Sequence, residues 1–221
     1  ARLDYPSGII VNPSLSPYHL QYEKNDNRVY LLGPEYVILR RSFRSVSRGP
    51  TNPTVKEVLV TIGGVTQDKA IEICETICAG YPDITFRFVL SANQRPVHIG
   101  NTARNVEFYS DIDADKMLTL VLGADLVISA AGQTIYELLA TQTPFIPVET
   151  VANQRTNVDG LRTINNYLDV LKLGEESFLQ GLKKEFVKML EFRRRDEATS
   201  LYRNVVDGLG SQRVIDCLLS R

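Results

Sequence analysis

The chain has 221 residues, 43% of them hydrophobic and 23% charged, which is ordinary globular composition and enough to build a core. A formal net charge of −1 gives no reason to expect nucleic acid or an anionic membrane as partner. No apolar run approaches the roughly 20 residues that span a bilayer, and the first residues lack the regions of a signal peptide. The sequence therefore predicts a soluble, cytoplasmic protein.

The first 50 residues do not follow the pattern of the rest. Short strands are expected at residues 8–11 and 29–32, but prolines interrupt the segment between them and no crossover helix is indicated. Residues 47–53 are typical of a linker. We therefore expect residues 1–50 to be the remnant of a preceding amino-terminal domain with its linker, so that the chain begins within a longer protein.

From residue 51 onward, short apolar runs alternate with amphipathic stretches. Buried strands are expected at residues 57–62, 85–90, 105–109, 125–128 and 145–148. Helices are expected at residues 66–79, 114–122 and 133–140, and another begins near Asn153. Strands and helices alternating at this spacing indicate βαβ units with right-handed crossovers. Residues 51–221 are thus predicted to form an α/β domain with a doubly wound, parallel, Rossmann-like sheet.

The end of the chain is predicted to be helical. Two long helices, at residues 175–190 and 196–219, have no strand between them. The basic triplet Arg193–Arg195 lies at their junction, where we interpret it as a solvated helix end rather than as a binding patch.

Two other clusters of polar residues could suggest metal binding. Cys74 and Cys78 lie four residues apart on one face of a predicted helix, but they extend an apolar stripe and favour a core position. Asp111, Asp113 and Asp115 follow a strand and precede a helix, so Asp113 or Asp115 is better interpreted as a helix cap or first-turn carboxylate. We expect no metal.

Ligands of an open parallel sheet bind beyond the carboxyl ends of its strands. After the first strand of the domain come Gly63 and Gly64. Glycine lets the backbone approach a phosphate closely and point its N–H groups at it. The alternative is a turn that merely requires a positive φ.

A second strand end carries the turn Ser129-Ala130-Ala131-Gly132-Gln133-Thr134, which opens a helix. Small residues at a helix start suit an anion, and Ser129 and Thr134 could add hydroxyl donors. Glu137 lies about one turn further, where a carboxylate can accept hydrogen bonds from a ribose diol. The alternative is that Ser129 or Thr134 is an N-cap and Glu137 an exposed helix-start carboxylate.

A third strand end places two amides, Asn153 and Gln154, at another helix start. Amides both donate and accept hydrogen bonds, which suits sugar hydroxyls or a phosphate edge. Asn153 could equally be a helix cap.

These motifs, in this order, resemble a known family. Segments 31–36, 62–64 and 124–138, followed by Pro144 and Asn153-Gln154, look like the UDP-sugar hydrolase of pseudaminic acid biosynthesis and the related spore-coat polysaccharide proteins. The sequence is more distantly similar to the GT-B transferase that adds N-acetylglucosamine to lipid-linked peptidoglycan precursor. The resemblance runs from about residue 9 to about 167 and implies the carboxy-terminal domain of a GT-B fold.

The resemblance also implies roles for individual residues. The Gly63-Gly64 loop and the turn from Ser129 to Thr134 would hold the pyrophosphate, and Glu137 would bind ribose. The backbone near Phe108 and Tyr109 would read the uracil. Asn153 and Gln154 would face the distal phosphate and sugar, with Asn153 a candidate to assist the reaction. No cofactor is implied.

The sequence departs from the family pattern at several positions. The family's second glycine, serine and tryptophan in the Ser-Ala-Gly-Gly-Ser-Thr-Trp-Glu turn are replaced by Ala131, Gln133 and Tyr136. The family's catalytic histidine lies in a Gly-rich loop of the amino-terminal domain, and it is carried onto neither His19 nor His98, which we expect at the surface.

The main interpretation is the UDP-sugar-binding half of a sugar-nucleotide hydrolase acting in surface polysaccharide or nonulosonic acid biosynthesis. A glycosyltransferase of GT-B type and a non-catalytic nucleotide-sugar-binding module are the alternatives, and the chain alone is expected to be inactive. Because the last helix of GT-B folds often crosses back to the amino-terminal domain, an apolar stripe would lack its partner and favour self-association. The stripe comprises Val205, Leu209, Val214 and Leu218.

Overall fold

The computed structural model describes residues 5–17, 20–22, 26–46, 48–63, 66–90, 105–166 and 169–220. Within these ranges a two-stranded parallel sheet is formed by β1 (Gly8–Asn12) and β2 (Arg28–Leu32). A six-stranded sheet has the order β5-β4-β3-β6-β7-β8, and its paired strands are all parallel. Its strands are β3 (Glu57–Thr61), β4 (Thr85–Leu90), β5 (Val106–Ser110), β6 (Leu126–Ala130), β7 (Phe145–Glu149) and β8 (Leu171–Lys172).

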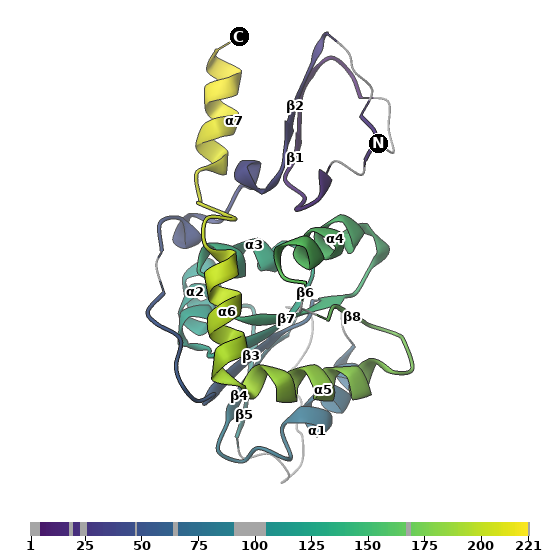
Figure 1. The fold of residues 1–221 in the computed structure, drawn as a ribbon, viewed down its shortest axis with the longest axis vertical. Helices are drawn as coiled ribbons and strands as arrows, with labels where there is room; N and C mark the ends of the chain where they lie inside the picture. The colour runs from purple at the N-terminus through teal and green to yellow at the C-terminus, as the bar shows by residue number, and fades with distance from the viewer. Residues whose placement is uncertain are drawn as a thin grey trace.

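Helices cover both faces of the large sheet (Figure 1). One face carries α1 (Gln67–Ile77) and α5 (Phe178–Leu190). The other carries α2 (Ala114–Gly123), α3 (Thr134–Ala140) and α4 (Arg155–Ile164). The remaining helices are α6 (Phe192–Tyr202), α7 (Gly210–Leu219) and the short 3-10 turns η2 (Pro34–Tyr36), η3 (Arg41–Phe43) and η4 (Ala152–Gln154). The doubly wound, parallel α/β fold expected from the sequence is confirmed.

The middle residues of the central strands are apolar and buried, because both faces of the sheet are covered. In β6, Leu126, Val127 and Ile128 are each 0% exposed. Leu126 and Ile128 pack into the cluster beneath α1 and α5, whereas Val127 packs into the cluster beneath α2 and α3. A strand buried on both sides reads as a continuous hydrophobic run, which is typical of parallel sheets. Cys74 and Cys78 are buried in the first of these clusters, which confirms their core position.

The amino-terminal segment packs directly onto the α/β unit. Val37, Leu39 and Phe43 are buried in the cluster with α2 and α3. A Cβ atom added at Gly160 of α4 would overlap Leu15, so the chain after β1 lies against that helix at a position that only glycine leaves open. The division into residues 1–50 and 51–221 stays a prediction.

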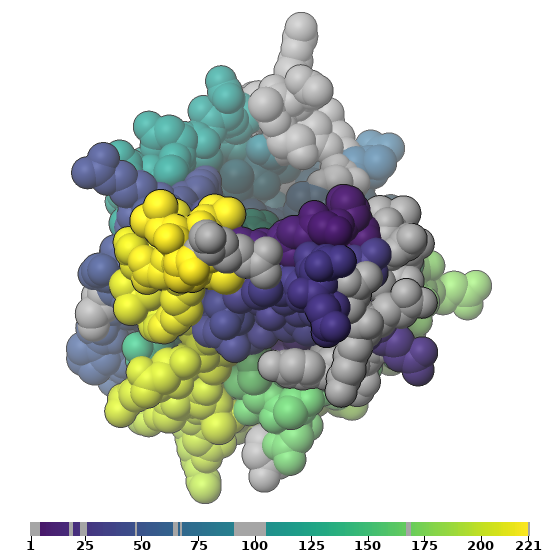
Figure 2. All heavy atoms as spheres, turned by 90° about the horizontal axis from the view of Figure 1, so that it is seen from above, coloured from purple at the N-terminus to yellow at the C-terminus, as the bar shows by residue number. Residues whose placement is uncertain are grey.

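The expected single helix over residues 196–219 is wrong, because two helices occupy this stretch. The helix α6 ends at Tyr202 and α7 begins at Gly210. Between them Asn204 and Gly208 adopt left-handed backbone conformations, with φ of 65° and 79°, which interrupt a right-handed helix. The new direction brings α7 beside β1 and β2, and Figure 2 shows it there next to the amino-terminal strands.

The basic triplet Arg193–Arg195 was expected to be a solvated helix end, but only part of it is exposed. Arg193 is exposed, but Arg195 is 0% exposed. Arg195 Nε donates to the Met189 carbonyl at 3.0 Å, near the end of α5. Its Nη1 and Nη2 atoms donate to the carbonyls of Asn52 and Pro53 at 2.8 and 3.1 Å. Burial lowers the pKa of Arg195. Arg195 is therefore a buried tie between the α5–α6 junction and the segment before β3.

Candidate functional site

The three predicted binding loops leave adjacent strands at one edge of the large sheet. In the strand register Thr61 of β3 pairs with Ser129 of β6, which pairs with Pro147 of β7. The chain that follows these strands therefore emerges side by side. Gly63 is among the described residues, whereas Gly64 lies outside them.

This edge includes the point where the winding of the sheet reverses. The chain enters at β3, moves outward to β5, and then returns to β6 on the other side of β3. In open α/β sheets the crevice at such a reversal is the usual ligand site.

Gln154 links the loop after β7 to the turn after β6. Its Oε1 accepts hydrogen bonds from Thr150, at 2.9 Å from the backbone N and 3.3 Å from Oγ1. The amide is thereby oriented with its donor end toward Gly132, where an added Cβ would lie 3.4 Å from Gln154 Nε2. The structure thus brings two separately predicted parts of the site together.

Two buried side chains hold the backbone of this turn in place, and neither was predicted to do so from the sequence. Tyr136 Oη donates to Asn157 Oδ1 at 2.6 Å, and Asn157 Nδ2 donates to the Ala131 carbonyl at 3.0 Å. Burial raises the pKa of Tyr136. An asparagine four residues before Leu161, on the buried face of α4, was the signal available in the sequence.

The hydroxyl groups of the turn are arranged differently from the expectation. Ser129 is fully buried, and its Oγ donates to the Ala130 carbonyl at 3.0 Å, so it is not turned toward a ligand in this structure. The N-cap position of α3 is Gln133, which makes no side-chain cap bond, and neither Ser129 nor Thr134 caps the helix.

Glu137 is held by a partner that the sequence did not reveal. Arg40 Nε donates to Glu137 Oε1 at 2.6 Å, and Arg40 Nη2 donates to Oε2 at 2.8 Å. The Glu137 side chain is only 3% exposed, whereas that of Arg40 is 45% exposed. The hydrogen bond that Arg40 donates to Glu137 raises the pKa of Arg40. Glu137 is therefore not an exposed helix-start carboxylate.

The predicted base-reading residues lie on β5, at the far side of β4. Phe108 packs on Phe88 with ring centroids 5.4 Å apart. Tyr109 Oη donates to Glu107 at 2.8 Å, which raises the pKa of Tyr109. From β5 to β6 is three strand spacings, about 14 Å, so these residues share the sheet with the turn without adjoining it.

Asn153 is exposed and belongs to η4, and it lines a pocket of about 510 Å³ between β1 and the start of α4. From the β1 side this pocket is lined by Asn12 and Tyr22, whose side chains are joined by a hydrogen bond of 2.6 Å. Arg155 and Asp159 line it from α4, at 3.3 Å from each other. Both polar and aromatic groups therefore border the space beside Asn153.

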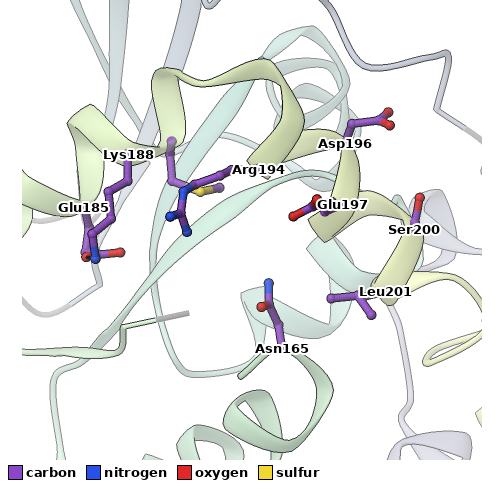
Figure 3. A pocket seen from close by; sticks show the side chains of 9 residues that line it. Asn165, Glu185, Lys188, Arg194, Asp196, Glu197, Ser200 and Leu201 are labelled. Carbon is purple, nitrogen blue, oxygen red and sulfur yellow. Dashed lines mark hydrogen bonds and ion pairs between the residues drawn. The ribbon is translucent and has the colours of Figure 1, made fainter. Parts of the chain in front are cut away.

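A second pocket, of about 350 Å³, lies between α5, α6 and the end of α4. Asn165 and Arg194 point toward each other across it, and Glu197 points into it from α6 (Figure 3). Lys188 on its rim pairs with Glu185. No residue predicted for nucleotide binding lines this pocket.

The acidic motif caps a helix. Asp113 is the N-cap of α2 and accepts a hydrogen bond of 2.7 Å from the Lys116 backbone N, which confirms its interpretation as a cap. Asp115 accepts a hydrogen bond from Ser42. In the described part of the chain no group of three His, Cys, Asp or Glu residues is placed to hold a metal ion. His19 and His98 lie outside that part.

Comparison with known proteins finds a relative in sequence whose name states an activity. No protein-family profile matches the chain. It is 28% identical over 151 residues to the "Pseudaminic acid cytidylyltransferase and UDP-2,4-diacetamido-2,4,6-trideoxy-beta-L-altropyranose hydrolase" of Helicobacter pylori. The similarity covers 68% of this chain and 28% of that protein, so the chain spans less than a third of its relative's length.

Similar folds occur in glycosyltransferases and an epimerase. The glycotransferase of kitacinnamycin has a TM-score of 0.65 at 18% identity, over 86% of this chain and 49% of its own. The UDP-GlcNAc 2-epimerase of Neisseria meningitidis, bound to UDP-GlcNAc, has a TM-score of 0.59 at 16% identity, over 76% and 45%. MurG of Acinetobacter baumannii has a TM-score of 0.59 at 16% identity, over 90% and 58%. The α/β fold of this chain is therefore similar to part of these structures, of which the chain spans about half.

Among the described helices, none combines the length and apolar character needed to cross a membrane.

Proposed function

We propose that this chain binds a UDP-sugar at the carboxyl edge of β3, β6 and β7. The observation that carries the proposal is the meeting of three loops at the reversal point of the sheet, with the Gln154 amide directed at Gly132. The similarity to a protein named as a UDP-sugar hydrolase supports the choice of uridine.

Each part of the nucleotide is assigned to its own group of residues. The diphosphate lies at the Gly63-Gly64 loop and the turn from Ser129 to Thr134, where Gly132 lies next to Gln154 Nε2. Glu137 accepts hydrogen bonds from ribose, and the backbone near Phe108 and Tyr109 contacts uracil.

The sugar is assigned to the 510 Å³ pocket beside Asn153. A hexose has hydroxyl groups around its rim and a less polar ring face. Asn12, Asn153 and Asp159 offer donors and acceptors to the hydroxyls, while Tyr22 offers an aromatic surface. Asn153 is the candidate among these to assist the reaction.

For the whole protein we propose hydrolysis of a sugar nucleotide in surface polysaccharide or nonulosonic acid biosynthesis, with water replacing UDP on the sugar. The sequence relative favours this activity. Transfer to an acceptor hydroxyl is the second candidate, because glycosyltransferases share the fold. A chain that binds the nucleotide without chemistry of its own is the third.

The first test is calorimetric titration of the chain with UDP, GDP and dTDP. UDP is expected to bind with the highest affinity, and the chain alone is expected to release little or no UDP from a UDP-sugar. No UDP binding, or a preference for GDP, would refute the assignment of the nucleotide.

A further inference from the structure

Glu137 cannot serve ribose in the arrangement that the structure shows. Arg40 donates to both of its carboxylate oxygens, at 2.6 and 2.8 Å. The Glu137 side chain is only 3% exposed while it is paired with Arg40, whose own side chain is 45% exposed. A ribose that binds Glu137 must therefore displace Arg40.

A displaced guanidinium needs another partner. Leaving a bidentate carboxylate costs Arg40 two charge-assisted hydrogen bonds, which are the stronger kind. At the same time, the residues proposed for the diphosphate, from Gly63 to Gly64 and from Ser129 to Thr134, include no lysine or arginine. The diphosphate thus has no cationic side chain among its proposed contacts. Arg40, for its part, would lose its carboxylate partner when ribose takes Glu137.

The geometry points to a partner exchange, which rests on the proposed function: when UDP binds, ribose takes Glu137, and Arg40 turns to the diphosphate. Glu137 is three residues beyond Thr134 in α3, which is about 4.5 Å along the helix axis, so the guanidinium starts near the turn. Its planar fork matches phosphate oxygens as it matches the carboxylate. Arg40 is then a nucleotide-binding residue, and the pair with Glu137 is its resting position.

The backbone of Arg40 is fixed while its side chain has room to move. Leu39 and Phe43, on either side of it, are 2% and 1% exposed. The guanidinium lies over the Phe43 ring, 5.0 Å from its centroid. Rotation about the side-chain bonds can re-aim this group without disturbing the buried segment.

Arg155 is the rival cation, because it follows Gln154 directly. It lies 3.7 Å from Glu149 and 3.3 Å from Asp159, and its side chain is 59% exposed. Binding at Glu137 displaces none of these contacts, so nothing couples Arg155 to the ribose.

The test compares UDP with uridine, which has the ribose but no phosphate. Calorimetry on wild type and Arg40→Gln gives the ratio of the two affinities, which is the contribution of the diphosphate. The exchange predicts that this ratio falls about tenfold or more in Arg40→Gln. Uridine itself should bind the variant more tightly, because it no longer has to displace a cation from Glu137. Arg40→Lys keeps the charge but loses the planar fork, so its ratio should lie between those of wild type and Arg40→Gln.

Two controls separate this role from others. Arg41→Gln removes the same charge from the exposed neighbouring residue, and Arg155→Gln removes the rival; both should leave the ratio unchanged. If Arg40→Gln does not fold, Arg40→Gln is made in the Glu137→Gln background, which leaves no buried charge. Compared with Glu137→Gln alone, the double variant should bind UDP more weakly and uridine equally well. An unchanged ratio in the Arg40 variants, or a loss in Arg155→Gln instead, overturns the exchange. A wild-type chain that binds no UDP refutes the proposed function itself.

Discussion

Glu137 and Glu149 are two buried carboxylates near the same edge of the sheet, but their surroundings differ. Glu137 is fully engaged by the guanidinium of Arg40. Glu149 ends β7 and has a single cation, Arg155, at 3.7 Å. This difference makes Glu149 a matched control for a role of Glu137 in ribose binding.

Replacing Glu137 with glutamine is expected to weaken UDP binding about tenfold or more, because an amide loses the charge-assisted hydrogen bonds to ribose. Glu149→Gln should bind as wild type does. Titration with 2′-deoxy-UDP isolates the cause, since removing one hydroxyl should cost wild type more affinity than it costs Glu137→Gln. Equal discrimination between the two nucleotides in wild type and Glu137→Gln would show that Glu137 does not contact ribose.

At the scale of single residues, the sequence predicted which residues are suited to a ligand, but not which other residues hold them in position. The glycine at position 132 and the amide at 154 were assigned to one ligand, and the structure places them together. Arg40 could not be assigned, because it is 97 residues away from Glu137 in the chain and sits in a segment that the sequence pattern described as part of another domain. Local patterns report propensity and burial, whereas such partners are set by the tertiary fold.

The junction of α5 and α6 depends on one buried cation. Arg195 donates to the carbonyls of Met189, Asn52 and Pro53. Asn52 Nδ2 in turn donates to Asp125 at 2.6 Å, and Asp125 accepts from the backbone N of Lys56 at the start of β3. The junction is thus connected to the amino-terminal edge of the central strands.

Arg195→Met is expected to lower the free energy of unfolding by about 3 kcal/mol or more, since it leaves three carbonyls without a donor in a buried site. Arg193→Met, two residues earlier in the same basic triplet, removes a side chain that is 88% exposed and paired with Glu197. It should change stability by about 0.5 kcal/mol at most. Urea denaturation of both variants makes the comparison. Equal stabilities would mean that Arg195 is not a structural tie.

Elements with a strong pattern were predicted closely, and elements set by packing were not. The expected strand at residues 85–90 coincides with β4, because its apolar residues alternate at the period of a strand. The two-residue strand β8 is too short to produce a pattern. The break between α6 and α7 follows from contacts: a Cβ at Gly210 would overlap the backbone of Val37, so the start of α7 is placed by the segment around η2.

Over the whole molecule, the start of α4 and the amino-terminal strands face each other across the pocket beside Asn153, with α7 next to β1 and β2. Of the predicted apolar stripe, Leu209 and Leu218 are 52% and 57% exposed, whereas Val205 is partly buried against the cluster with α2 and α3. The helix α7 leaves large apolar side chains exposed. They are Ile215, Leu218 and Leu219, which are 47%, 57% and 81% exposed. Self-association through this helix stays a prediction.

The sequence predicted the doubly wound parallel sheet because alternating strands and helices admit few parallel topologies. The sequence did not predict the contacts that join the amino-terminal segment to the α/β unit, such as that of Leu15 with Gly160. Such contacts depend on shape complementarity between distant parts of the chain, which no periodicity records.

The central claim is that the nucleotide binds where the loops after β3, β6 and β7 meet, and Gly132→Val tests it most directly. A side chain at this position extends toward Gln154 Nε2, 3.4 Å from the added Cβ, and fills the space assigned to the diphosphate. Gly123→Val is the control, because Gly123 ends α2 and an added Cβ meets nothing within 4 Å. The account predicts that Gly132→Val lowers UDP affinity about tenfold or more while Gly123→Val keeps it. A folded Gly132→Val chain that binds UDP as tightly as wild type would contradict the account.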